Sequence, residues 1–77
     1  MKTIVIRGEH IELYKLLKFE ALVASGGEAK ALIAEGRVVV NGDVETRKRK
    51  KLSVGDTVQV FGDTFIIAAA SGGLPEA

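Results

Sequence analysis

The spacing of apolar residues changes at Gly36, and this change constrains the fold more than any other feature of the sequence. Before Gly36, apolar residues recur three or four positions apart, which is typical of helices. After Gly36, short runs rich in valine and isoleucine alternate with turn dipeptides, which is typical of strands. A further β-branched run lies at residues 3–6. We therefore predict an α+β fold in which two N-terminal helices pack on a small, mostly antiparallel β-sheet.

Two helices are predicted in the first half of the chain. The first runs from residue 9 or 10 to residue 20, and its buried face carries Leu13, Leu16 and Leu17. The second runs over residues 27–35, and its buried face carries Ala29, Leu32 and Ile33. We expect a capping box before it, in which the Ser25 hydroxyl accepts from the Glu28 amide and the Glu28 carboxylate reaches back to the Ser25 amide. Gly36 is expected to end this helix.

The rest of the chain is predicted to form strands and turns. The strands are expected over residues 3–6, 38–40, 57–61 and 64–67, and residues 44–46 are expected to lead outward from a turn after the second of them. Tight turns are expected at Asn41-Gly42 and Gly62-Asp63, and residues 52–56 are interpreted as a longer turn. The three phenylalanines, Phe19, Phe61 and Phe65, are assigned to the core. This leaves Tyr14 as the aromatic side chain available to stack on a base.

Five consecutive cations form the most concentrated charge in the chain: Arg47, Lys48, Arg49, Lys50 and Lys51. The chain has 11 Lys and Arg residues against 10 Asp and Glu residues, so the remainder holds 6 cations against 10 anions. Like charges at this spacing repel one another and favour a solvated, extended segment unless an anion meets them. The run is either a solvated loop that aids solubility or, with Lys15, Lys18, Lys30 and Arg37, part of one phosphate-binding surface.

The residue types present give little support to catalysis or metal binding. The chain has no cysteine and one histidine, His10, which excludes disulfides, thiolate metal sites and multi-histidine sites. Each serine fits a cap, a turn or the tail, so no pairing of a nucleophile with a base is indicated. We predict no enzyme activity, no metal and no cofactor.

The apolar stretches are short. The longest, residues 65–70, has six residues, whereas roughly 20 are needed to cross a bilayer. We therefore expect no membrane contact and a cytoplasmic location. We also expect a monomer with a single domain over residues 1–70 and a flexible C-terminal tail over residues 71–77.

The order of these motifs resembles that of the S4 RNA-binding domain, also called the alpha-L motif. The resemblance covers residues 12–60 and rests on Ser25 followed by Ala29-Lys30-Ala31-Leu32-Ile33, on Gly36-Arg37-Val38-Val39-Val40-Asn41-Gly42, and on Gly55-Asp56 before a strand. In that family the second helix and the following β-turn face RNA. The resemblance therefore implies RNA contacts from Lys15, Lys30, Arg37, Asn41, Arg47, Lys48, Arg49, Lys50 and Lys51.

Two positions depart from the family's pattern. Many members have an arginine after the serine that opens the second helix, where this chain has Gly26, and many have a glycine where Ala21 stands. Because that arginine is missing, residues 47–51 are expected to supply more of the phosphate contacts. The chain is similar to small standalone bacterial members of the family. The resemblance implies a non-enzymatic protein that binds structured RNA such as ribosomal RNA.

Two other functions stay open from the sequence. The cations would also suit an adaptor that docks an acidic protein partner. The Asn41-Gly42 turn and the late Gly72-Gly73 are similar to those of β-grasp sulfur carriers, whose Gly-Gly ends the chain so that its carboxylate can be activated. Here four residues follow Gly73, and a sulfur carrier explains neither the five cations nor the capped helix.

Overall fold

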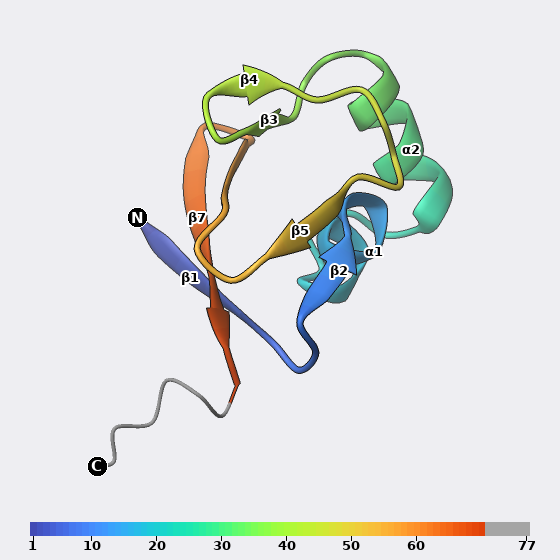
Figure 1. Cartoon of the computed structure of the whole chain (residues 1–77). Coiled ribbons are helices and arrows are strands. Elements are labelled where there is room, and N and C mark those ends of the chain that lie inside the picture. Colours follow the sequence, from blue (N-terminus) through green and yellow to red (C-terminus); the bar gives the residue numbers. More distant parts are fainter. Residues whose placement is uncertain (71–77) are drawn as a thin grey trace, which may run out of the picture.

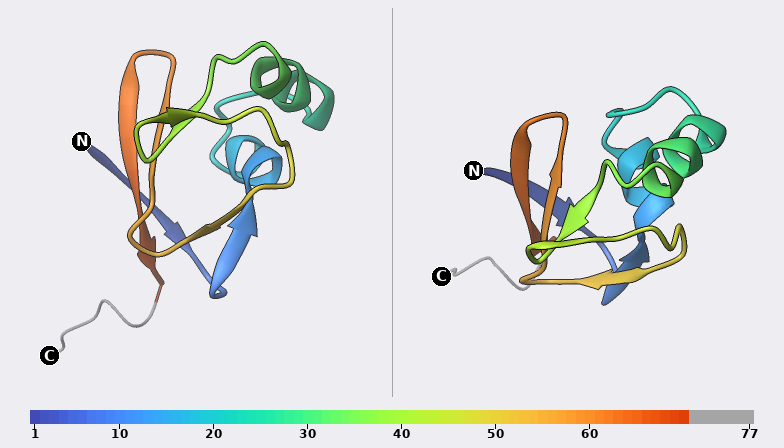
Figure 2. Two further views of the ribbon diagram at one scale, coloured as in Figure 1. Left: turned by 45° about the horizontal axis from the view of Figure 1, so that its top comes forward. Right: turned by 90° about the horizontal axis from the view of Figure 1, so that it is seen from above.

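A five-stranded sheet forms one side of the molecule, and two helices with a two-stranded sheet form the other (Figures 1 and 2). The computed structural model describes residues 1–70. Its elements are β1 (Lys2–Ile6), β2 (His10–Glu12), α1 (Leu13–Phe19), α2 (Gly26–Ala34), β3 (Val39–Val40), β4 (Asp43–Val44), β5 (Lys51–Ser53), β6 (Thr57–Val60) and β7 (Asp63–Ala69). Within this part of the chain, neither helix has the length and apolarity needed to cross a membrane.

The pairing of the strands confirms the α+β class and the mostly antiparallel sheet. The large sheet has the order β1-β7-β6-β3-β4, in which β1 and β7 are parallel and the other neighbours are antiparallel. The small sheet pairs β2 with β5 in the antiparallel sense. The helices are not the first elements of the chain, because β1 and β2 precede them.

The first helix begins later than predicted. Residues 10–12 are extended as β2, and α1 begins at Leu13. The reason is tertiary: β2 takes ladder partners from β5, with His10 opposite Ser53 and Glu12 opposite Lys51. The same pairing makes the interpretation of residue 52 as part of a turn wrong, since Leu52 lies in the middle of β5.

The second helix has the predicted capping box with one change of partner. The Ser25 hydroxyl accepts from the Glu28 amide at 3.2 Å, while the Glu28 carboxylate accepts from the Ala24 amide at 2.8 Å rather than from that of Ser25. The helix lies one residue earlier than expected, and Gly36 follows it with a φ of 76°. Two residues of the predicted stripe, Ala29 and Ile33, are buried.

Two hairpin turns are built from residue pairs in the left-handed region. Asn41 and Gly42 have φ values of 51° and 88°, as a type I′ turn between β3 and β4 requires. The β6–β7 turn uses Phe61 and Gly62 instead of the predicted Gly62-Asp63, with φ values of 57° and 80°. Phe61 therefore lies at the tip of the turn and is 57 % exposed. The assignment of Phe61 and Phe19 to the core is wrong, since both are exposed, whereas Phe65 is buried.

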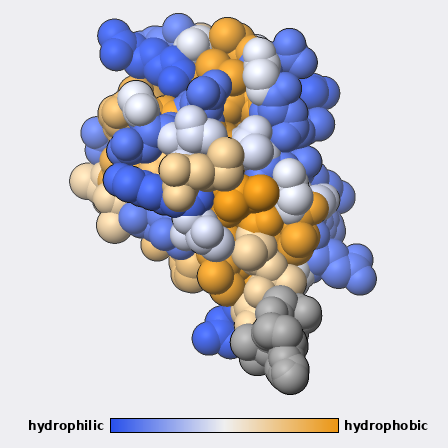
Figure 3. All heavy atoms as spheres, turned by 90° about the vertical axis from the view of Figure 1, so that its left-hand side faces the viewer, coloured by the Kyte–Doolittle hydropathy of each residue, from blue (hydrophilic) through white to orange (hydrophobic). Residues whose placement is uncertain are grey.

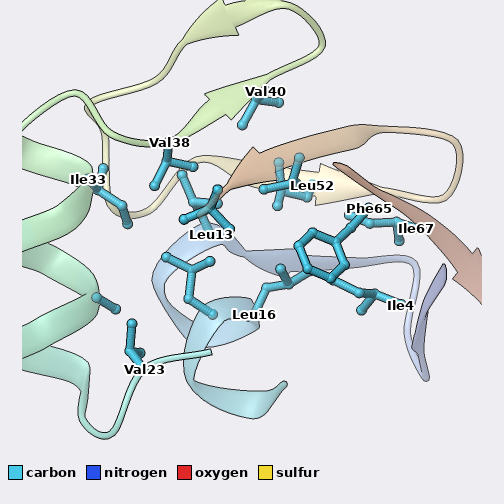
Figure 4. Packing of buried hydrophobic residues seen from close by; sticks show 14 of the residues in the cluster. Ile4, Leu13, Leu16, Val23, Ile33, Val38, Val40, Leu52, Phe65 and Ile67 are labelled. Carbon is cyan, nitrogen blue, oxygen red and sulfur yellow. The ribbon is translucent and has the colours of Figure 1, made fainter. Parts of the chain in front are cut away.

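The hydrophobic core lies between α1 and the large sheet (Figure 4). The α1 leucines at its centre are completely buried, as predicted: Leu13, Leu16 and Leu17. Leu52 of the small sheet belongs to the same core and is also completely buried. Because β5 begins at Lys51, the last cation of the run, the burial of Leu52 ties that run to the core.

The outward face of β1 carries an exposed apolar side chain. In β1, Val5 is 47 % exposed and lies between Ile4 and Ile6, which are buried. Val5 is opposite Ala68 of β7 in the parallel register. Figure 3 views the molecule from this side and shows apolar surface among hydrophilic residues. The cations of the run belong to none of the strands of this sheet.

Replacing Leu52 tests its role as the anchor of β5. We expect Leu52→Ala to lower the free energy of unfolding by about 2–5 kcal/mol, because it leaves a cavity in the core. Val54→Ala is the matched control, since Val54 is 50 % exposed and surface changes cost about 0.5 kcal/mol or less. Urea denaturation followed by circular dichroism measures the free energy of unfolding of both variants. Equal decreases in the two variants would contradict the role of Leu52 as an anchor.

Candidate functional site

The cationic run lies beside the second helix and forms one wall of an open groove. The chain from β4 to β5 passes in front of α2 in Figure 1. The groove has a volume of about 900 Å³. We call it the basic groove, and it is lined by Lys30 and Ala34 of α2 and by Thr46, Arg47, Lys48, Arg49, Lys50 and Lys51. The fold thus brings Lys30 together with all five cations of the run.

The backbone of the run caps the first helix. The Leu13 amide donates to the Lys50 carbonyl at 2.9 Å, and the Tyr14 amide donates to the Lys48 carbonyl at 3.0 Å. The first amides of a helix lack partners within it, and the N-cap residue Glu12 makes no side-chain cap here. Two carbonyls of the run therefore cap the N-terminus of α1. With the backbone held against α1, the Lys48 and Arg49 side chains are exposed to solvent.

Arg47 is held by a carboxylate just before it. Its Nε lies 2.9 Å from Glu45 Oε2 and its Nη2 lies 3.2 Å from Oε1, while its backbone amide also donates to Oε2 at 3.0 Å. The hydrogen bond from the Arg47 side chain, followed by that from its amide, lowers the pKa of Glu45 from 4.5 to about 2. The same contact raises the pKa of Arg47. Arg47 is thus fixed in place with its charge paired.

The other cations of the run differ from Arg47 in their ion pairing. Within the described residues no carboxylate lies in salt-bridge range of Lys48, Arg49, Lys50 or Lys51. They hold the charge of the basic groove that is available to an anion.

Tyr14 links Lys15 and Lys30 to this surface. The Lys30 ammonium lies 5.2 Å from the centre of the Tyr14 ring, and the Lys15 ammonium lies 6.0 Å from it. These are cation–π distances. Tyr14 is half-buried against the core, so its ring orients the two lysines. Lys15 also lines a hollow together with Lys51, which places it at the margin of the basic groove.

Two of the predicted contacts lie apart from the basic groove. Arg37 pairs with Glu35 at 3.1 Å on the surface after α2. The Asn41 side chain is engaged within the fold, because Nδ2 donates to Asp56 at 3.1 Å and Oδ1 accepts from the Thr57 amide at 2.9 Å. The geometry of Asn41 is that of a residue that fixes the turn. Contact of either residue with RNA stays a prediction.

Sequence reasoning missed the residues that position the cations. Glu45 had a visible signal, because a carboxylate two positions before an arginine lies on the same side of an extended chain. The capping carbonyls of Lys48 and Lys50 had no signal, since backbone carbonyls are present at every position. Tyr14 was noted as an aromatic, but its contact with Lys30 depends on how α1 packs beside α2.

Comparison with known proteins decides the family. The S4 domain model matches residues 4–68 of the chain. The chain belongs to the S4 domain family. Over 60 residues this S4 domain is 50 % identical to YbcJ of Escherichia coli K12, described as a candidate RNA-binding protein, covering 78 % of this chain and 86 % of YbcJ. It is 41 % identical over 59 residues to RlbA of Bacillus subtilis, covering 77 % of this chain and 83 % of RlbA, a protein whose name proposes a role in ribosome maturation.

Solved structures agree with this S4 domain assignment. The solution structure of E. coli YbcJ, described as having an alpha-L motif involved in RNA binding, superposes with a TM-score of 0.68 at 46 % identity and covers 90 % of this chain and 89 % of YbcJ. The 30S ribosomal protein S4e of Thermoplasma acidophilum superposes with a TM-score of 0.64 at 19 % identity, covering 75 % of this chain and 31 % of S4e. The second likeness concerns the fold alone.

The pKa of the Glu45 carboxyl group tests the pairing of Arg47 with Glu45, which we call the Arg47 clamp. Its pKa in the folded chain is about 2 against an ordinary 4.5, so the clamp stabilises the fold above pH 4.5 and is lost as the pH falls toward 2. We expect carbon NMR of the Glu45 carboxyl to titrate with a midpoint near 2, and that of the Arg47→Gln variant to titrate at a higher pH but still below 4.5, because the amide of residue 47 still donates to Glu45. The same midpoint in both proteins would show that Arg47 does not hold Glu45.

Proposed function

We propose that this chain binds structured RNA, such as ribosomal RNA, through phosphate contacts in the basic groove and catalyses no reaction. The observation that carries the proposal is the capping of α1 by the Lys48 and Lys50 carbonyls. This capping leaves the Lys48 and Arg49 side chains exposed in the groove that Lys30 also lines, with no carboxylate partner among residues 1–70. The descriptions of YbcJ as RNA-binding and of RlbA as a ribosome maturation protein support the same partner.

Phosphate binding follows from the electrostatics of the groove. Neighbouring cations repel one another, and the hydrogen bonds to α1 hold them together despite that repulsion. An RNA backbone relieves the repulsion, and each neutralised phosphate releases condensed counterions. Because the backbone that carries these side chains is already held against α1, binding does not have to order that backbone. This arrangement favours recognition of the shape and charge of the RNA backbone.

We assign the direct phosphate contacts to the cations that are unpaired or oriented toward the groove, namely Lys30, Lys48, Arg49, Lys50 and Lys51. Lys15 adds a contact at the margin, and Arg47 supplies a fixed guanidinium held by Glu45. Arg37 and Asn41 take secondary roles, because the first is paired with Glu35 and the second fixes a turn. We place this activity in the cytoplasm and assign it to a monomer.

The salt dependence of binding tests the phosphate contacts. For about five contacts, the slope of log affinity against log salt is expected to be about −3 to −5. The triple variant Lys48→Gln, Arg49→Gln, Lys50→Gln keeps the capping carbonyls and should bring the slope about 2–3 closer to zero. Fluorescence anisotropy with a labelled RNA hairpin and with ribosomal RNA measures these values.

The matched control for this test is Lys2→Gln. Lys2 lies at the start of β1, away from the basic groove, and pairs with Asp63 at 3.4 Å (Figure 1). It should leave the slope unchanged. A wild-type slope near zero, or equal slopes for the triple variant and the wild type, would overturn the phosphate mechanism.

Ribonuclease treatment of a lysate distinguishes an RNA partner from an acidic protein partner. We expect material captured by the purified chain to be RNA and to be lost when the lysate is treated with ribonuclease. The triple variant should capture less of this RNA than the wild type, because it lacks three of the cations that are proposed to bind it. A single acidic protein that stays bound after ribonuclease treatment would instead identify the chain as an adaptor.

A further inference from the structure

Phe19 is an exposed aromatic side chain that the core does not explain. It is the last residue of α1 and is 64 % exposed. It belongs neither to the buried cluster nor to the half-buried residues that pack against that cluster, which are Ile11, Tyr14, Leu22 and Leu32. A face of its ring is therefore accessible to a ligand.

The surroundings of Phe19 are cationic. Phe19 and Ile11 line a hollow of about 390 Å³ together with Lys15 and Lys18. The same two apolar residues line a second hollow of about 220 Å³, whose charged or titratable members are Arg7 and His10. Among the described residues, no carboxylate lines either hollow. An apolar ring between cations suits a ligand that is flat and aromatic and carries negative charge on both sides.

The site is continuous with the basic groove. Lys51 belongs both to the basic groove and to a hollow that contains His10, Ile11, Glu12 and Lys15, and the Glu12 carboxylate in it lies 3.3 Å from the Lys15 ammonium. Ile11 and Lys15 in turn line the hollow beside Phe19. A band of mainly cationic residues, with Glu12 as its one carboxylate among the residues that line these hollows, thus runs from the groove, past the start of α1, to Phe19 at its end.

We propose that an unpaired base of the bound RNA stacks on Phe19, while the adjoining phosphates contact Lys15 and Lys18 on one side and Arg7 on the other. This inference rests on the proposed RNA-binding function and narrows it. Bases inside a duplex are already stacked, so the base that reaches Phe19 must come from a bulge, a loop or a strand end. The class of ligand is therefore a structured RNA that displays an unpaired nucleotide next to a paired stem.

Three RNA hairpins distinguish stacking from backbone binding. The first is a fully paired stem, the second has one bulged adenosine, and the third has an abasic bulge at the same place. The wild type should bind the adenosine bulge most tightly. Phe19→Ala should weaken that binding about 5- to 150-fold, the range for loss of one stacked base, and leave binding to the other two hairpins unchanged. Fluorescence anisotropy gives the affinities.

Matched variants test whether the aromatic ring of Phe19 itself is needed for the preference for the bulged adenosine. Phe19→Tyr keeps the ring and should keep the preference for the bulged adenosine, whereas Phe19→Leu keeps an apolar side chain and should lose it. Phe61→Ala removes another exposed phenylalanine, at the β6–β7 turn, and should change nothing. Urea denaturation checks that Phe19→Ala and Phe19→Leu remain folded, as expected for so exposed a side chain.

The possible failures are distinguishable. If the wild type binds all three hairpins equally, or if Phe19→Ala affects all three to the same degree, stacking on Phe19 is overturned and the phosphate mechanism stands. If the wild type binds none of the three with salt-dependent affinity, the RNA-binding function and the stacking site both fall.

Discussion

Two hydrogen bonds, from the Leu13 and Tyr14 amides to the Lys50 and Lys48 carbonyls, connect the parts of this small fold. A helix as short as α1 is unstable by itself in water, because few hydrogen bonds offset the cost of starting it. Here its first amides are satisfied by a segment far along the chain, and its leucines pack in the core. The same contacts give the cationic run a fixed path. The stability of the helix and the shape of the candidate interface therefore depend on one another.

This arrangement explains how five consecutive cations can be held in one place. A run of five cations would repel itself into an extended loop if nothing held it. Backbone capping, the burial of Leu52 and the pairing of Arg47 with Glu45 hold the run beside α2. None of these contacts uses the ammonium groups of the lysines. The fold thus orders the segment and keeps its charge available, which is the condition for a preformed phosphate-binding surface.

Local signals were sufficient for the elements whose partners lie nearby in sequence. The capping box of Ser25 and Glu28 and the Asn41-Gly42 turn were predictable, because each is decided within a few residues by side-chain chemistry and backbone sterics. The leucines of α1 were assigned to the core by their spacing for the same reason. Even the family likeness to the S4 domain was visible, since its motifs are short and occur in a fixed order.

The class of the fold, the second helix, the Asn41-Gly42 turn and the concentration of positive charge in one segment could be predicted from the order of the residues. Three features follow from the folded arrangement alone: residues 10–12 form a strand, Phe19 and Phe61 are exposed, and the five cations of the run share a groove with Lys30. The physical reason is the range of the interactions. Propensity, capping and turn geometry act between neighbours, whereas strand pairing, burial and the meeting of charges depend on groups that the folded chain alone brings together.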